Sequence, residues 1–236
     1  MLSNIRPLLV VVFIVSFLFG CATPTSAPTQ PTAVPTQPAP TSTPGIPVEQ
    51  VTIPVENASF PATVTGNGEI AVIIASTGED TPSDWEPLVQ TLRTNEHLRI
   101  ITFAYRDLVG TADKDMAAVL NYVRNAGITK IICIGAGVGS RFCANLRDEP
   151  DIIGMIFIAT ESLGIKSDFP KLFLTADADP FGMAGSTERV YNQSAEPKTF
   201  KSYAAGVHGP ALFKADVGPE VLTDISSFIN EIVNGQ

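Results

Sequence analysis

The sequence contains few residues of the kinds that hold metals or bind nucleic acids. It has only three cysteines, two histidines far apart and no Cys-x-x-Cys pair, so it shows no metal-ligand spacing, and we expect neither a metal nor another cofactor. Basic residues are also scarce: the 15 Lys and Arg are outnumbered by 24 Asp and Glu, which gives a net charge of −9. Such an acidic chain repels phosphate backbones, which argues against a nucleic-acid partner.

Charge is almost absent from the N-terminal part of the chain. Arg6 is the only charged side chain before Glu49, and an apolar run from Leu8 to Val15 follows it. This run has the length of a signal-peptide core and is too short to span a bilayer comfortably as a permanent helix. We therefore expect residues 1–20 to be an export signal and the protein to lie on the extracytoplasmic side of a membrane.

The end of this segment, Leu18-Phe19-Gly20-Cys21, resembles the lipobox of bacterial lipoproteins. The resemblance implies that Cys21 becomes the lipid-modified first residue of the mature protein. Acyl chains would then anchor the protein, at about 0.8 kcal/mol for each buried methylene. The alternative is an ordinary signal peptide whose cleavage site contains a cysteine.

The segment after the cysteine, residues 22–48, consists mainly of Pro, Thr, Ala, Ser and Gln. Eight of the chain's nineteen prolines lie from Pro24 to Pro47. Such a segment cannot bury enough apolar surface to offset the entropy of ordering. We expect residues 21–48 to be a lipidated cysteine and a disordered tether, which at ~3.1 Å per residue would reach at most about 80 Å.

The remaining residues, 49–236, predict one α/β domain. Alternating strands and helices with short connections favour a mostly parallel sheet with helices on both faces, and two further stretches at its start favour an antiparallel hairpin. The expected strands are Val51–Val55, Phe60–Val64, Ile70–Ala75, Leu98–Phe103, Lys130–Ile134, Ile152–Ile158 and Lys171–Leu174, and the expected helices are Trp85–Leu92, Met116–Val123, the segment after Gly139 and an amphipathic helix containing Leu222–Ile232.

The segment Gly135-Ala136-Gly137-Val138-Gly139-Ser140 follows the predicted strand Lys130–Ile134 and precedes a helix. Its place and spacing resemble the G-x-S-x-G nucleophile elbow of the α/β-hydrolases, where small residues permit a sharp strand-to-helix turn. The resemblance extends over nearly all of residues 50–236. It implies the α/β-hydrolase fold and a site at the carboxyl ends of the parallel strands.

Further motifs follow in the order of that family. The resemblance implies that the backbone amides of Thr77 and Val138 are the oxyanion-hole candidates and that His208, in Val-His-Gly, is the catalytic histidine. The acid of the triad would lie in Ala-Asp-Ala-Asp-Pro after strand Lys171–Leu174. Asp179 matches the family better than Asp177 there, although both remain candidates.

The sequence departs from the family at the centre of the elbow, because the nucleophile position is Gly137. Without a hydroxyl or thiol at this position, the acyl-enzyme route is closed. Ser140 lies three residues further on, where we expect it to cap or pack at the helix start rather than to replace the nucleophile. We expect Cys133 and Cys143 to be small core residues that do not bridge each other.

The same glycines also resemble a dinucleotide-binding turn, G-x-G-x-x-G, with Ser140 in place of the third glycine. Glu161 follows about twenty residues later, where an acid would hold a ribose. In that fold the glycine turn usually follows the first strand of its domain. Here several predicted strands precede it, and this hypothesis leaves Asp179 and His208 unexplained.

Only about a dozen residues separate strand Ile152–Ile158 from strand Lys171–Leu174, where α/β-hydrolases often insert a lid. We therefore expect no sizeable lid and an open, shallow site. The sequence favours an exported lipoprotein whose hydrolase-like domain binds a small molecule or a partner protein without catalysis. The alternative is an active, esterase-like hydrolase in which His208 is the base and Asp179 its partner, with water or an unexpected residue as nucleophile.

Overall fold

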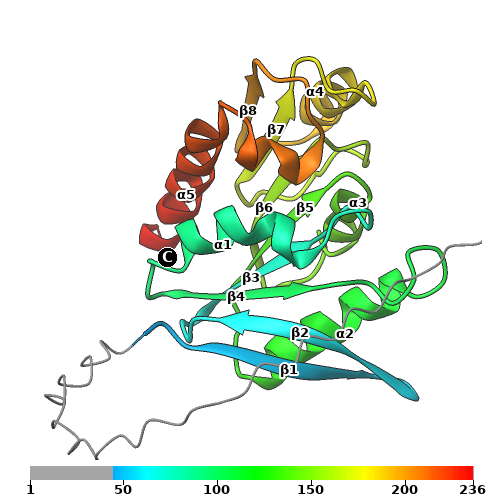
Figure 1. The fold of residues 1–236 in the computed structure, drawn as a ribbon, viewed down its shortest axis with the longest axis vertical. Coiled ribbons are helices and arrows are strands. Elements are labelled where there is room, and N and C mark those ends of the chain that lie inside the picture. Colours follow the sequence, from blue (N-terminus) through cyan, green and yellow to red (C-terminus); the bar gives the residue numbers. More distant parts are fainter. Residues whose placement is uncertain (1–44, 236) are drawn as a thin grey trace, which may run out of the picture. The chain divides into compact units, whose positions relative to one another are not determined.

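The computed structural model describes residues 45–235, which form one eight-stranded sheet with helices on both faces (Figure 1). The predicted export signal, Cys21 and most of the predicted tether lie outside the described residues. The strand order is β1-β2-β4-β3-β5-β6-β7-β8. Strands β3 to β8 run parallel, while the hairpin β1-β2 adds an antiparallel edge, with β2 antiparallel to β4.

The strands are short and the inner ones are apolar throughout. All six residues of each of β3, β5 and β7 are buried, as expected for parallel strands covered on both faces. The strands are β1 Val48–Val55, β2 Ala58–Thr65, β3 Ile70–Ala75, β4 Leu98–Phe103, β5 Ile131–Ala136, β6 Ile152–Ile158, β7 Lys171–Ala176 and β8 Lys198–Tyr203.

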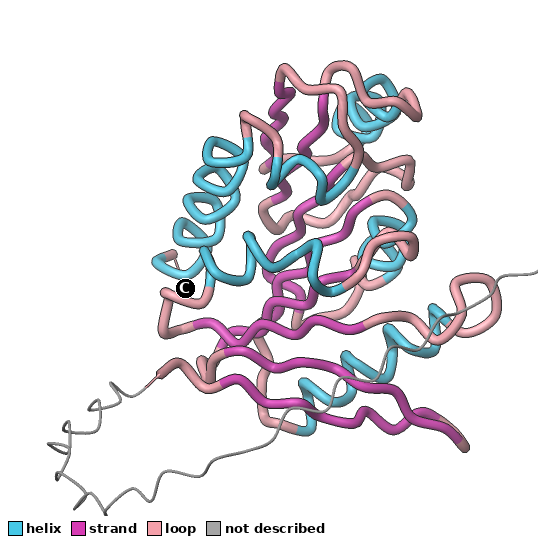
Figure 2. Tube along the Cα trace, in the orientation of Figure 1, coloured by secondary structure: helices cyan, strands magenta, loops and turns pink. Residues whose placement is uncertain are grey.

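The helices divide between the two faces of the sheet (Figure 2). One buried cluster joins the sheet to α2, α3 and α4, and the other joins it to α1, α5 and the short 3₁₀ helix η2. The helices are η1 Pro82–Trp85, α1 Glu86–Leu92, α2 Ala112–Asn125, α3 Val138–Asn145, α4 Met183–Gln193, η2 Gly209–Lys214 and α5 Gly218–Asn234. The predicted α/β class, the mostly parallel sheet and the initial hairpin are confirmed.

Several predicted boundaries need correction. The strand before the elbow begins at Ile131 rather than at Lys130 and extends through Ala136. The first predicted helix begins as the 3₁₀ turn η1 before continuing as α1. Strand β8 and helix α4 were not expected, and β1 begins at Val48, one residue before the predicted start of the domain.

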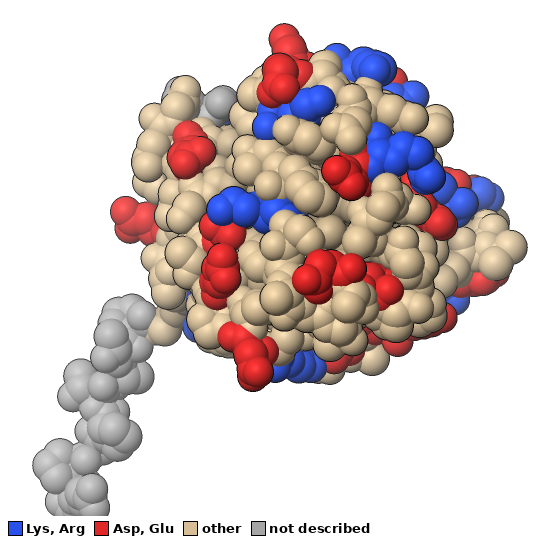
Figure 3. All heavy atoms as spheres, turned by 90° about the horizontal axis from the view of Figure 1, so that it is seen from above, with Lys and Arg blue, Asp and Glu red and all other residues tan. Residues whose placement is uncertain are grey.

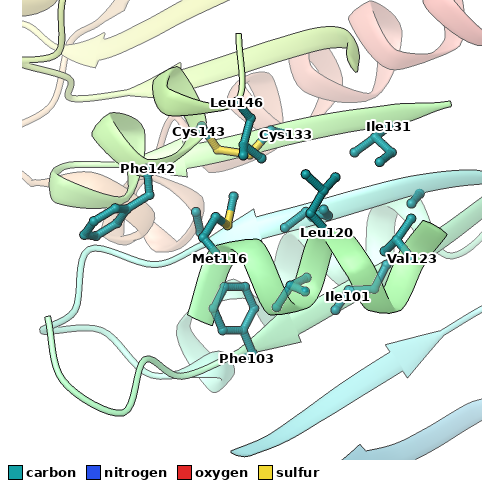
Figure 4. Packing of buried hydrophobic residues seen from close by; sticks show 14 of the residues in the cluster. Ile101, Phe103, Met116, Leu120, Val123, Ile131, Cys133, Phe142, Cys143 and Leu146 are labelled. Atoms are coloured by element: carbon teal, nitrogen blue, oxygen red, sulfur yellow. A yellow bond between two sulfur atoms is a disulfide. The ribbon is translucent and has the colours of Figure 1, made fainter. Parts of the chain in front are cut away.

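The prediction that Cys133 and Cys143 do not bridge each other is wrong. They form a disulfide between β5 and α3, with their Cα atoms 5.7 Å apart and both side chains fully buried (Figure 4). The physical reason is the sharp turn at residue 137, which folds α3 back against the strand that precedes it. Sequence separation alone therefore overestimated the distance between the two positions.

The connection between β6 and β7, residues 159–170, contains no helix or strand, so the predicted absence of a sizeable lid is confirmed. None of the helices in residues 45–235 combines the length and apolar character needed to cross a membrane. On the face shown in Figure 3, acidic and basic side chains lie in small separate groups on a mostly uncharged surface.

Candidate active site

The turn between β5 and α3 has the backbone of a nucleophile elbow. Gly137 has φ +50° and ψ −121°, a conformation that residues with a Cβ rarely adopt. Gly139 packs so closely under β3 that a Cβ there would lie 2.1 Å from the carbonyl oxygen of Ala75. The glycine at the centre therefore accommodates the turn geometry, and the glycine two residues later permits the close approach of helix and sheet.

The predicted histidine and acid come together beside this turn. Asp179 lies in the loop after β7, and His208 is the residue immediately before η2. The His208 Nδ1 and the Asp179 Oδ2 are 2.8 Å apart, and the Asp179 side chain is only 1% exposed. The backbone N–H of Phe181 donates to the other carboxylate oxygen of Asp179 at 2.8 Å. Both oxygens of this buried carboxylate are thus hydrogen-bonded.

Asp177, the other candidate acid, is placed differently. Its side chain is exposed and accepts a hydrogen bond from the backbone N–H of Ala205 at 3.1 Å. It therefore ties the loop after β7 to the loop after β8. The structure pairs His208 with Asp179 and not with Asp177.

The imidazole of His208 faces the empty nucleophile position. A Cβ built on Gly137 would lie 3.3 Å from the His208 Nε2 and 3.4 Å from Cγ2 of Thr77. The rings of Phe181 and His208 form a T-shaped pair, with the ring centroids 4.8 Å apart. Histidine, acid and elbow thus have the arrangement of a hydrolase triad, but the central residue offers no nucleophilic atom.

Ser140 is unavailable as a substitute nucleophile. Its side chain is fully buried, and its hydroxyl donates to the carbonyl oxygen of Gly135 at 2.9 Å. It packs at the start of α3, as predicted from the sequence.

The oxyanion-hole region contains a carboxylate that the sequence interpretation missed. Asp80 accepts hydrogen bonds at Oδ1 from the backbone N–H of Thr77 at 2.5 Å and of Gly78 at 3.1 Å. The Thr77 hydroxyl donates to the same oxygen, and the Trp85 indole N–H donates to Oδ2. The Thr-x-x-Asp spacing of residues 77–80 is typical of local side-chain capping, and it was the sequence signal that could have indicated this contact. Val138, the other predicted oxyanion-hole residue, is the first residue of α3.

These residues surround an open cleft formed by two adjoining hollows, of about 260 Å³ and 420 Å³. Both hollows are lined by Thr77, Glu79, Phe181 and His208. The smaller hollow also contains Gly137, Val138 and apolar side chains, and Glu161 of the dinucleotide hypothesis lines it as well. The predicted open site is thus a cleft at the carboxyl ends of β3, β5, β6, β7 and β8.

Several solved structures that superpose on this chain are esterases. A thermostable carboxylesterase cloned from a metagenomic library superposes with a TM-score of 0.66 at 18% identity, covering 82% of this chain and 91% of its own. An esterase of Pyrococcus furiosus gives 0.66 at 12% identity, over 79% and 93% of the two chains. A hyperthermophilic esterase of Pyrobaculum calidifontis gives 0.63 at 16% identity, over 79% and 86%.

No family model matches the chain, and no curated protein matches its sequence. The likeness therefore lies in the fold, which these esterases share over most of their length. The described part of the chain has the α/β-hydrolase fold, with no sizeable lid between β6 and β7.

Proposed function

We propose that this protein is a cell-envelope lipoprotein whose α/β-hydrolase-like domain binds a small-molecule or protein ligand without catalysing ester hydrolysis. The observation that carries this proposal is the elbow itself. His208 and Asp179 are paired beside Gly137, where a hydrolase would need a nucleophile. The cleft around them persists, so the site retains the means to bind while lacking the atom that forms an acyl-enzyme.

A second observation supports loss of catalysis independently of the missing nucleophile. The backbone N–H of Thr77 would have to point at the developing oxyanion of a substrate. It instead donates to the Asp80 carboxylate. An occupied donor cannot stabilise a transition-state charge unless Asp80 moves away.

The test is to expose the protein to a serine-directed fluorophosphonate probe and to short-chain p-nitrophenyl esters. We expect no labelling and no turnover above that of the His208→Ala variant, which serves as the matched control. Labelling that maps to Ser140 would contradict the burial-based argument for that residue.

The alternative is an active hydrolase in which His208 activates water directly. The observation that favours it is the position of the His208 Nε2, which faces the cleft in a side chain that is 22% exposed. General-base activation of water requires this placement. Ester turnover that disappears in His208→Ala and weakens in Asp179→Asn would establish this alternative. Saturable binding of NAD in preference to any ester would instead support the dinucleotide hypothesis.

Membrane attachment through Cys21 is the other part of the proposal, and it rests on the lipobox resemblance and the tether composition. We expect the full-length protein to partition into the detergent phase of a Triton X-114 extraction. The Cys21→Ser variant should remain unprocessed or appear in the aqueous phase. A wild-type protein with an unmodified N-terminus in the aqueous phase would refute lipidation.

A further inference from the structure

The cleft is lined by more acidic than basic side chains. Glu79 and Glu161 line the smaller hollow, which contains no Lys or Arg. Neither carboxylate forms a salt bridge with any described residue. The larger hollow adds one lysine, Lys214, but its ammonium group lies 2.8 Å from a carboxylate oxygen of Asp84. The cleft therefore presents two carboxylates that form no salt bridge with a described residue.

Asp80 occupies hydrogen-bond donors that a ligand oxygen in this cleft would need. In an esterase, the loop after β3 directs amide N–H groups at an anionic oxygen. In this chain the amides of Thr77 and Gly78 already donate to the Asp80 carboxylate, which is fixed from its other side by the Trp85 indole. A ligand carboxylate or carbonyl oxygen would lack these two donors and would approach a negative charge.

Apart from Thr77 and His208, the remaining walls of the smaller hollow are apolar. Leu108, Val138 and Met183 line it, together with Phe181, a residue that is 63% exposed. An exposed aromatic ring beside carboxylates is a favourable surface for an organic cation, because the ring face and the carboxylates both attract positive charge. The apolar wall would contact the uncharged part of the same molecule.

From these three features we propose that the cleft binds a small organic cation with an apolar body and that Asp80 is its specificity-determining residue against anions. This inference rests on the proposed binding function and names its ligand class. Glu79 and Glu161 supply the attraction, while Asp80 occupies the donors that an anionic ligand would need.

The test compares three probes of similar shape and different charge: benzylammonium, benzyl alcohol and benzoate. Binding is measured by NMR titration of the full chain at low and at high salt, with the resonances of residues 45–235 as the readout. We expect benzylammonium to bind about tenfold more tightly than benzoate at low salt, since each exposed carboxylate contributes a few tenths to one kcal/mol. Benzyl alcohol should fall between them, and salt should reduce the difference.

Two substitutions test the attraction. Glu79→Gln and Glu161→Gln should each weaken benzylammonium binding about twofold to fivefold, with benzyl alcohol affinity unchanged. Glu49→Gln, which removes the same charge from exposed β1, is the matched control and should change neither. Equal losses in all three variants would show a general charge effect and would overturn the assignment to the cleft.

A third substitution is expected to increase the affinity for benzoate, which misfolding of the variant would not do. Asp80→Ala frees the amides of Thr77 and Gly78, so benzoate affinity should rise severalfold and the two amide resonances should shift on its addition. Asp107→Ala is the control, because Asp107 accepts equivalent loop hydrogen bonds from Val109 and Gly110. An unchanged benzoate affinity in Asp80→Ala would overturn the role of Asp80.

The proposal also fails if wild-type protein binds benzoate as tightly as benzylammonium, or binds none of the three probes. These outcomes are distinct from failure of the proposed function, which would appear as His208-dependent ester turnover. An active esterase that still prefers the cationic probe would refute the non-catalytic proposal alone.

Discussion

Replacing Gly137 with serine tests whether residue 137 occupies a nucleophile elbow. At φ +50° and ψ −121°, any residue with a Cβ is strained. The added Cβ would also lie 3.3 Å from the His208 Nε2 and 3.4 Å from Cγ2 of Thr77, contacts that are tight but not impossible. The serine hydroxyl, one bond further on, would then come within hydrogen-bonding reach of the imidazole.

The structure sets the size and sign of the expected effects. Backbone strain of this kind costs on the order of 1–3 kcal/mol. For a domain of this size, each kcal/mol lowers Tm by about 2–4 °C, so Gly137→Ser should lose about 2–12 °C. The same variant should react with a fluorophosphonate probe at residue 137, because His208 can accept the hydroxyl proton while Asp179 orients the ring.

The assay combines a thermal scan with a labelling gel. Gly137→Ala is the matched control, because it adds the same Cβ without a hydroxyl and should lose similar stability while remaining unlabelled. Adding His208→Ala to Gly137→Ser should abolish the labelling. If Gly137→Ser melts at the wild-type temperature and stays unlabelled, residue 137 is not at an elbow and the site assignment fails.

Three further outcomes follow from individual contacts. In the Gly137→Ser background, Asp80→Ala should accelerate labelling by at least about tenfold, since a single oxyanion-hole donor can contribute 10²–10³ in rate; an unchanged rate would show that Asp80 does not block the hole. Replacing Cys133 and Cys143 together with alanine should lower the free energy of unfolding by roughly 2–3 kcal/mol, because the disulfide reduces the entropy of the unfolded chain. Urea unfolding measures this loss, and an unchanged free energy of unfolding would contradict a stabilising disulfide. Lys214→Met should destabilise the protein at pH 6 by less than about 1 kcal/mol, because the salt bridge between Lys214 and Asp84 is largely exposed. The hydrogen bond from Lys214, followed by those from the backbone and side chain of Thr81, lowers the pKa of Asp84 from 3.8 to about 2. The contribution of Lys214 is therefore present above pH 3.8 and is lost as the pH falls toward 2; a difference between the two proteins that is undiminished at pH 2 would refute this.

The inner strands could be predicted because their residues are apolar without interruption. Strand β3, Ile-Ala-Val-Ile-Ile-Ala, has no polar position, and burial on both faces explains this composition. Strand β8 was missed for the opposite reason. It lies at the sheet edge, and only Tyr203 of Lys-Thr-Phe-Lys-Ser-Tyr is buried. Helix α4 was missed because only Thr187 and Val190 of its eleven residues are buried.

At the site, the resemblance to the α/β-hydrolases and the order of its motifs predicted His208 beside an aspartate, and the two meet because loops after parallel strands lie at one edge of the sheet. The choice between Asp177 and Asp179 required the geometry of the loop after β7, which turns one carboxylate inward and leaves the other exposed. The Thr-x-x-Asp spacing is only a weak signal for the contact between Thr77 and Asp80, because the contact also requires a particular loop conformation. The disulfide was missed because the elbow reverses the chain within a few residues.

The presence of His208 and Asp179 does not by itself imply catalysis, because the pair also contributes to the stability of the fold. Asp179 is 1% exposed, and His208 is the side chain that hydrogen-bonds its Oδ2. Removing the histidine would leave a buried carboxylate with an unsatisfied oxygen, which is costly. Gly137 carries no such penalty, because glycine relieves backbone strain at the elbow. Loss of selection for catalysis would therefore remove the nucleophile and preserve the pair. The occupied amides of Thr77 and Gly78 are consistent with the same direction of change, since Asp80 satisfies donors that an active esterase must leave open.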